Sequence, residues 1–140
     1  MAYQIRRTKK FTDTLELLGK NGAVEKSLSV EIDLDAVSRN YRKTLVALSD
    51  AELSLKKAQA EKNVEIFDAA YIAYGYSIIA LFELTLGKEN TVEILNFFEN
   101  RYTEMALQII PYISEVITPL ISDVIKQKKR EMKRINRWRH

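Results

Sequence analysis

The longest uncharged stretch of the chain, residues 69–82, predicts a helix at the centre of the structure. Its apolar side chains recur every three or four residues, as they do on one face of a helix. The opposite face is apolar as well, because it carries Ile72, Tyr76 and Ile79 beside Ala73. A helix that is apolar on all sides lies inside a core or is covered by another subunit. Fourteen uncharged residues fall short of the roughly 20 that a bilayer crossing requires.

Residues 11–33 predict a β-hairpin ahead of this helix. Apolar and polar residues alternate from 28 to 32, which is the period-2 pattern of a half-buried strand. Apolar residues also occupy odd positions within 11–17, and the segment 19–22 is rich in turn-forming residues. A short helix over residues 12–18 is the alternative interpretation.

A helix of about 25 residues is expected after Asp33, which is a good N-cap. Apolar side chains recur every three or four residues across 34–58, as in the seam of a coiled coil. Lys62 and Asn63 interrupt the pattern before the central helix. We expect that helix to end at Gly87, in the left-handed conformation that glycine adopts readily.

The central helix contains Gly75, and a glycine inside a helix indicates the close approach of another helix. Further helices are expected after the central one. Asn90 is expected to cap a third helix, with Glu93 completing a capping box. Pro111 predicts a break or kink near residues 109–110, since proline removes a helical hydrogen bond. A second proline within the apolar stripe that follows allows another kink.

Composition agrees with a mainly α fold. The 140 residues include only four Gly and two Pro, too few for the many turns of a sandwich or barrel. No Cys is present, and no apolar segment follows the basic N-terminus as it would in a signal peptide, so we expect a soluble cytoplasmic protein. We predict a single domain, 1–140, that is a bundle of three to four helices with a short N-terminal β-hairpin and a basic C-terminal tail. Its parts are a basic flexible arm (1–10), the hairpin (11–33), a helical core (34–125) and the tail (126–140).

Charge is distributed unevenly along the chain, although the net charge is only +3. Residues 126–140 contain eight Lys and Arg against one Glu, and residues 1–10 contain four against none. The body between them is therefore acidic. We expect the tail to begin as a helix, because Lys is favourable near a helix C-terminus, and then to fray.

Residue types that carry catalysis are scarce. The only His is the last residue, His140, and the four glycines never form a phosphate-binding loop. Glu31, Asp33 and Asp35 alternate as hard-cation ligands would, but strand-edge charge and helix capping explain them better. The acidic residues within 61–68 have no His partner for a carboxylate-bridged metal pair. We therefore expect no enzyme, no catalytic residue, no cofactor and no metal site.

Aromatic and basic residues also allow a nucleic-acid interpretation. Tyr71 and Tyr74 could stack on bases, and the basic tail could contact phosphates. Both tyrosines lie on the helix that we expect to be buried, so core packing explains them better. The tail could equally pair with the acidic body of a neighbouring subunit or with an acidic partner.

The order of these features is distinctive. An acidic-aliphatic strand, VEIDLD at residues 30–35, leads into a long charged helix and then the apolar helix. The stretch LFELTLGKENTVEILNF at 81–98 opens the next helix, and the chain ends in Lys and Arg. Over most of residues 27–140 this order resembles the small tail assembly chaperones of long-tailed phages and prophages of Gram-positive bacteria. The two prolines and a longer N-terminus depart from that family's pattern.

The resemblance implies a non-enzymatic protein that acts as an oligomer in the host cytoplasm. Such chaperones coat and solubilise the helical tape-measure protein, recruit tail-tube subunits and are absent from the mature virion. An amphipathic partner helix could bind the apolar residues that follow Pro111, although ordinary core packing explains these residues at least as well: Ile113, Val116, Ile117, Leu120 and Ile121. We expect no membrane partner. The alternatives are a small nucleic-acid-binding protein that acts through its basic termini and a structural virion component.

Overall fold

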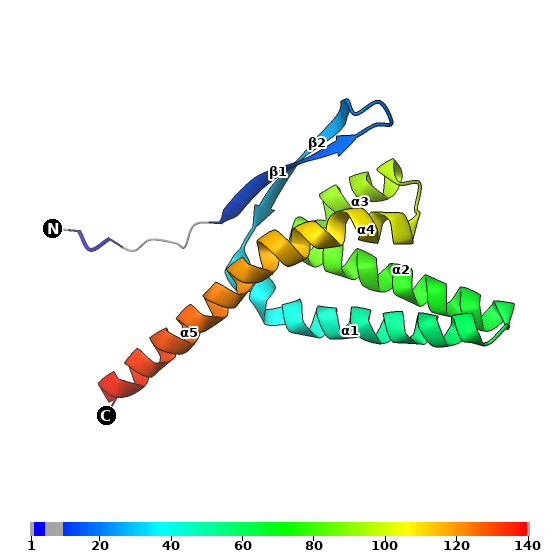
Figure 1. The fold of residues 1–140 in the computed structure, drawn as a ribbon. Coiled ribbons are helices and arrows are strands. Elements are labelled where there is room, and N and C mark those ends of the chain that lie inside the picture. Colours follow the sequence, from blue (N-terminus) through cyan, green and yellow to red (C-terminus); the bar gives the residue numbers. More distant parts are fainter. Residues whose placement is uncertain (1, 5–9, 140) are drawn as a thin grey trace.

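The computed structural model describes residues 2–4 and 10–139, and it is mainly helical with an antiparallel hairpin at its N-terminal end (Figure 1). Most of the predicted flexible arm, including residues 5–9, lies outside the described residues. The mainly α fold and the N-terminal hairpin are confirmed. The elements are β1 (Phe11–Leu18), β2 (Val24–Ile32), α1 (Leu34–Ala60), α2 (Val64–Leu86), α3 (Lys88–Phe97), α4 (Tyr102–Tyr112), a π-helical turn (Ile113–Ile117) and α5 (Thr118–Arg139).

The hairpin is held in register by cross-strand pairs. Phe11 lies opposite Ile32, and Leu15 lies opposite Leu28, so apolar residues of both strands share one face. That face packs on the helices, with Leu28 and Ile32 fully buried. The alternative of a short helix over residues 12–18 is therefore wrong.

Helices α1 and α2 form an antiparallel pair that extends away from the hairpin (Figure 1). The side chain of Asp33 accepts a hydrogen bond from Ala36 N at 3.2 Å, which confirms it as the cap of α1. Asn63 caps α2 by accepting from the backbone N–H groups of Glu65 and Ile66, at 3.0 and 3.2 Å. The predicted interruption at Lys62 and Asn63 is thus confirmed.

Gly87 joins α2 directly to α3. Its φ is +93°, as expected for a glycine at this end, but its ψ of 157° is extended and not left-handed helical. The predicted cap at Asn90 is wrong, because α3 begins two residues earlier and Gly87 occupies the cap position. The Asn90 amide instead donates to the carbonyl oxygens of Ser29 and Leu86, at 2.8 and 2.9 Å. Asn90 therefore fastens α3 to β2.

Glu93 does not complete a capping box either. Its carboxylate pairs with Lys26 of β2, which adds a second link between α3 and the hairpin. The stretch predicted as one helix after Gly87 is also divided, because a turn separates α3 from α4. Glu99 and Asn100 form this turn with φ of +54° and +61°.

Pro111 lies within α4, and the helix does not break there. The π-helical turn follows at once, and α5 continues from it through Pro119 to Arg139. The prolines lack backbone N–H groups, and the wider hydrogen-bonding pattern of a π turn tolerates the missing donors. The Thr118 hydroxyl donates to Ile113 O at 3.1 Å. Of the break or kink predicted near residues 109–110, the break is wrong, and the helical irregularity lies at the π turn instead. The predicted fraying of the tail is wrong for the described residues.

The core lies where the second half of α2 meets the hairpin, α3, α4 and the π turn. Phe82 is completely buried at its centre. Gly75 lies under the ring of Tyr102 from α4, which confirms the predicted close approach at this glycine. Three of the five residues proposed as a binding groove after Pro111 are also core residues, so that groove is wrong: Ile113, Ile117 and Ile121.

Candidate protein-interaction surface

The first half of α2 leaves the core and exposes apolar side chains. Tyr76 is 68% exposed and Ile72 is 53% exposed, and neither is covered by α1. Between Glu65 and Glu83, the exposed residues of this helix are uncharged except for Asp68, which lies beside this apolar side of the helix. The buried residues of the central helix therefore begin at Gly75, and from Ile66 to Ala80 the helix also retains the uncovered apolar face that the sequence indicated.

These exposed residues form one continuous helical face. They recur every three or four positions and span about 21 Å, since a helix rises 1.5 Å per residue. Small alanines alternate with larger side chains on this face, so a second helix can approach the backbone closely. We call it the α2 face; it consists of Ile66, Ala69, Ile72, Ala73, Tyr76 and Ala80.

Aromatic rings on the neighbouring side of α2 are engaged within the chain. Tyr71 stacks on Phe67 with 6.2 Å between ring centroids and contacts Tyr102 at 5.7 Å. Tyr74 is half-buried, and burial raises the pKa of its hydroxyl above the ordinary value, so it remains neutral. Core packing therefore accounts for Tyr71 and Tyr74, and neither presents a free ring face for stacking on bases.

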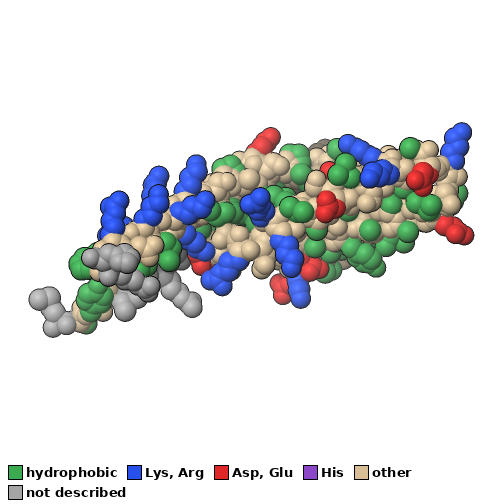
Figure 2. Space-filling view, turned by 90° about the horizontal axis from the view of Figure 1, so that it is seen from below, with side chains coloured by type: hydrophobic (Ala, Val, Ile, Leu, Met, Phe, Trp, Pro, Cys, Tyr) green, Lys and Arg blue, Asp and Glu red, His purple; other side chains and the backbone are tan. Residues whose placement is uncertain are grey.

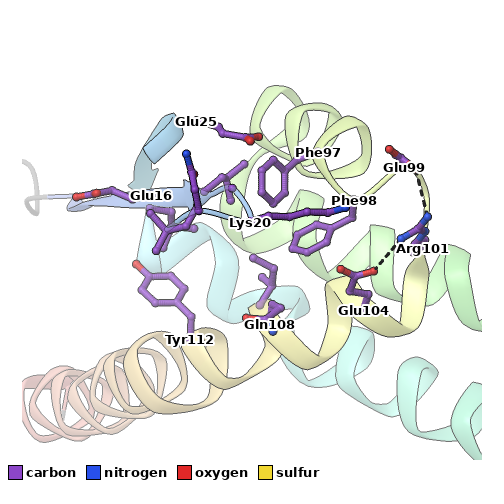
Figure 3. A pocket seen from close by; sticks show the side chains of 16 residues that line it. Glu16, Lys20, Glu25, Phe97, Phe98, Glu99, Arg101, Glu104, Gln108 and Tyr112 are labelled. Atoms are coloured by element: carbon purple, nitrogen blue, oxygen red, sulfur yellow. Dashed lines mark hydrogen bonds and ion pairs between the residues drawn. The ribbon is translucent and has the colours of Figure 1, made fainter. Parts of the chain in front are cut away.

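A cleft of about 860 Å³ opens between the hairpin and the junction of α3 with α4 (Figure 3). Its apolar lining includes Leu17, Phe97 and Phe98. The rings of the two phenylalanines meet edge to face, with 5.0 Å between their centroids. Arg101 on its rim pairs with Glu99 at 3.4 Å and with Glu104. The cleft has an apolar floor and a charged rim, which suits an apolar side chain of a partner.

Tyr112 lines this cleft and has a strongly raised pKa. Its hydroxyl donates to Asp13 Oδ2 at 2.8 Å, and burial together with this carboxylate raises the pKa of Tyr112 far above its ordinary value. A tyrosine that stays protonated at neutral pH is a hydrogen-bond donor here and ties α4 to β1.

The alternating acidic residues at the end of the hairpin have separate partners. Glu31 pairs with Lys10 at 3.2 Å, and Asp33 caps α1. Asp35 pairs with Lys128 of α5 at 2.7 Å, and the hydrogen bond from this lysine lowers the pKa of Asp35. Across residues 2–4 and 10–139, no group of three metal-ligating side chains comes together.

Two helical segments of the described chain, Val64–Leu86 and Tyr102–Trp138, are long and apolar enough to cross a membrane by length and composition. The same criteria also select core helices of soluble proteins. Core burial explains the apolar residues in the second half of α2 and at the start of α5, but not the α2 face.

The sequence analysis named candidate groove residues on a different helix from the exposed apolar face. It placed the candidate groove after Pro111, whereas the exposed apolar residues lie on α2. The available signal was the second apolar face of α2, since a single neighbour such as α1 covers only one side of a helix.

No model of a protein family, no curated protein and no solved structure matches the chain. The resemblance to tail assembly chaperones therefore rests on the order of the sequence features. The α2 face adds a structural observation that is independent of that resemblance.

Proposed function

We propose that the protein is a non-enzymatic tail assembly chaperone of a long-tailed phage. In this proposal it binds and solubilises the tape-measure protein in the host cytoplasm, recruits tail-tube subunits and is absent from the mature virion. It acts as a homo-oligomer, with no cofactor and no membrane partner. Its helices form the predicted bundle of three to four, and the basic end of α5 is the tail.

The α2 face carries this proposal. An amphipathic helix binds an apolar groove or face through side chains at positions i, i+3, i+4 and i+7. The α2 face has the same periodicity, and its alanines allow close packing against such a helix. Burying the exposed parts of Ile72 and Tyr76 contributes about 1–2 kcal/mol each, enough for these two residues to dominate binding. A long helical partner would repeat the contact along its length.

Co-expression tests the proposal. The tagged chain is produced together with the product of the longest neighbouring open reading frame, which is the candidate tape-measure protein. The purified material is washed at high salt. We expect soluble, salt-resistant co-elution, because apolar burial is weakly affected by ionic strength. The doubly substituted Ile72→Glu, Tyr76→Glu chain should lose the partner.

Leu107→Glu is the matched control, because Leu107 is a similarly exposed apolar residue on α4, outside the α2 face. This variant should retain the partner. Equal co-elution of the control and the doubly substituted chain would exclude the α2 face as the binding surface. An insoluble partner, with this chain eluting alone, would contradict the chaperone function itself.

Purified particles distinguish the chaperone from a structural virion component. Mass spectrometry should find the tail-tube protein in the particles and this chain in the lysate only. Stoichiometric amounts of this chain in mature particles would favour the structural role.

A further inference from the structure

The last part of α5 projects beyond the rest of the molecule (Figure 1). The last polar contacts of α5 with α1 are made by Lys128, with Asp35 at 2.7 Å and with the Ser38 hydroxyl at 3.5 Å. From residue 129 to residue 138 every side chain is exposed. Ten residues of helix, 129–138, are therefore helical without packing on another described element.

Six basic residues follow one face of this projecting helix. Their spacing of three, one, three, one and three places them within one arc of the helix. Between the first and the last of them this arc holds no acidic residue, and none of the six belongs to an ion pair of the described residues. Figure 2 shows Lys and Arg side chains projecting along this end of the molecule. We call it the basic face; it consists of Lys126, Lys129, Arg130, Lys133, Arg134 and Arg137.

The charges of the basic face repel one another in the isolated chain. Like charges three or four residues apart destabilise a helix by about 0.2–0.5 kcal/mol per pair. The face extends about 17 Å, because it spans eleven rises of 1.5 Å. A duplex carries roughly one negative charge per 1.7 Å of its axis. A phosphate backbone that runs along the face therefore offers more than enough negative charges to pair with all six basic residues.

We propose that the basic face binds the phosphate backbone of nucleic acid without sequence specificity. Such binding relieves the repulsion within the helix and releases counterions from the phosphates. The proposal concerns a surface that is separate from the α2 face and does not depend on the chaperone function.

An anionic membrane fits the same helix less well. The exposed apolar residues Met132, Ile135 and Trp138 recur every three residues on the side of α5 away from the basic face, and Glu131 lies beside Ile135 and Trp138. A membrane that accepted this apolar side would also receive the Glu131 carboxylate, and three separate apolar side chains offer little area for insertion. Nucleic acid requires only the basic face, and a helix can lie along a phosphate backbone with its apolar side uncovered.

Trp138 provides a direct reporter of binding. It is the only Trp of the chain, it is 88% exposed, and it lies one helical turn beyond Arg134 at the edge of the basic face. A bound nucleic acid should therefore change its fluorescence, most strongly for a single strand whose bases can stack on the indole.

The test measures fluorescence anisotropy of a labelled 20-base-pair duplex of arbitrary sequence, titrated with the full-length protein over a series of salt concentrations. We expect a plot of log affinity against log salt with a slope of about −4.5 to −5.4, for five or six phosphate contacts. The Lys129→Gln, Lys133→Gln, Arg137→Gln variant should bind at least tenfold more weakly at low salt. Its slope should be shallower by about 3, since each contact contributes roughly 0.9.

The matched control removes the same charge elsewhere. Arg42→Gln, Lys43→Gln, Lys56→Gln alters three exposed basic residues of α1 and should retain the affinity and the slope. Equal weakening of both variants would show that net charge alone drives binding and would overturn the proposal. Absence of salt-dependent binding to the duplex would overturn it as well, and so would binding to phosphatidylserine vesicles in flotation without binding to the duplex.

Discussion

Gly75 and Tyr102 form the contact whose removal gives the most direct test of the packing. A Cβ at position 75 would lie 2.5 Å from Cδ2 and 2.8 Å from Cζ of the Tyr102 ring. The ring is also held by Tyr71, at 5.7 Å between centroids, so it cannot move away without losing that contact. Gly75→Ala therefore forces either the ring or the start of α4 to shift by about 1 Å, to reach an ordinary carbon separation.

Two effects of this substitution oppose each other. Alanine stabilises a helix interior by about 1 kcal/mol relative to glycine. Overpacking a well-filled contact costs about 1–3 kcal/mol. We expect Gly75→Ala to lower the free energy of unfolding by about 1 kcal/mol. In a Tyr102→Ala background the ring is absent, and the same substitution should raise it by about 1 kcal/mol.

The double-mutant cycle isolates the contact. Urea unfolding of the four proteins, followed by far-UV circular dichroism, should give a coupling free energy of about 1–3 kcal/mol between the two positions. Measurements at two protein concentrations separate this effect from any self-association. A stabilisation by Gly75→Ala that is the same with and without the Tyr102 ring would refute the close approach of α2 and α4.

Three further substitutions test single features of the fold. Lys128→Met should raise the pKa of Asp35 towards its ordinary value in an NMR titration. Because this pKa is lowered in the folded chain, the contact with Lys128 stabilises the fold at neutral pH, and this stabilisation is lost as the pH falls through the pKa of Asp35. Glu99→Gly should raise the free energy of unfolding by about 0.5–1 kcal/mol, because the residue has a φ of +54°. Glu104→Gly, in the first turn of α4 where the backbone is helical, should lower it by about 1 kcal/mol. Asn90→Ala removes two hydrogen bonds between α3 and its neighbours and should cost about 1–2 kcal/mol in urea unfolding.

Local sequence signals predict the hairpin and the start of α1 well. Alternation of apolar and polar residues identifies β2, and Asp33 is followed at once by a helical periodicity. These signals are strong because each element buries one face and exposes the other. The turn at Glu99 and Asn100 has no comparable signal, since neither glycine nor proline marks it. Asn100 adopts a positive φ readily, but Glu99 does not, and burial of Ile94 before the turn and Met105 after it holds Glu99 in this conformation.

The helix beyond Pro111 shows how packing overrides a local rule. Proline predicts a break because it lacks an N–H group and crowds the preceding turn. The π-helical turn that follows keeps Ile113 and Ile117 in the core, and their burial offsets the lost hydrogen bond. The candidate binding surface was missed for a related reason. The sequence shows that both faces of α2 are apolar, but only the tertiary structure shows which of them α1 covers.

The α2 face is better explained by binding than by folding. A residue that is half-exposed contributes little to the stability of the free chain, and surface substitutions usually change it by less than about 0.5 kcal/mol. Ile72→Glu should therefore leave the urea midpoint unchanged, whereas Ile78→Ala in the buried half of α2 should cost about 2–5 kcal/mol. The two outcomes separate the roles of one helix, because a loss of partner binding in the Ile72→Glu chain could not then be attributed to unfolding. A large destabilisation by Ile72→Glu would mean instead that this face is already covered, by a second copy of the chain.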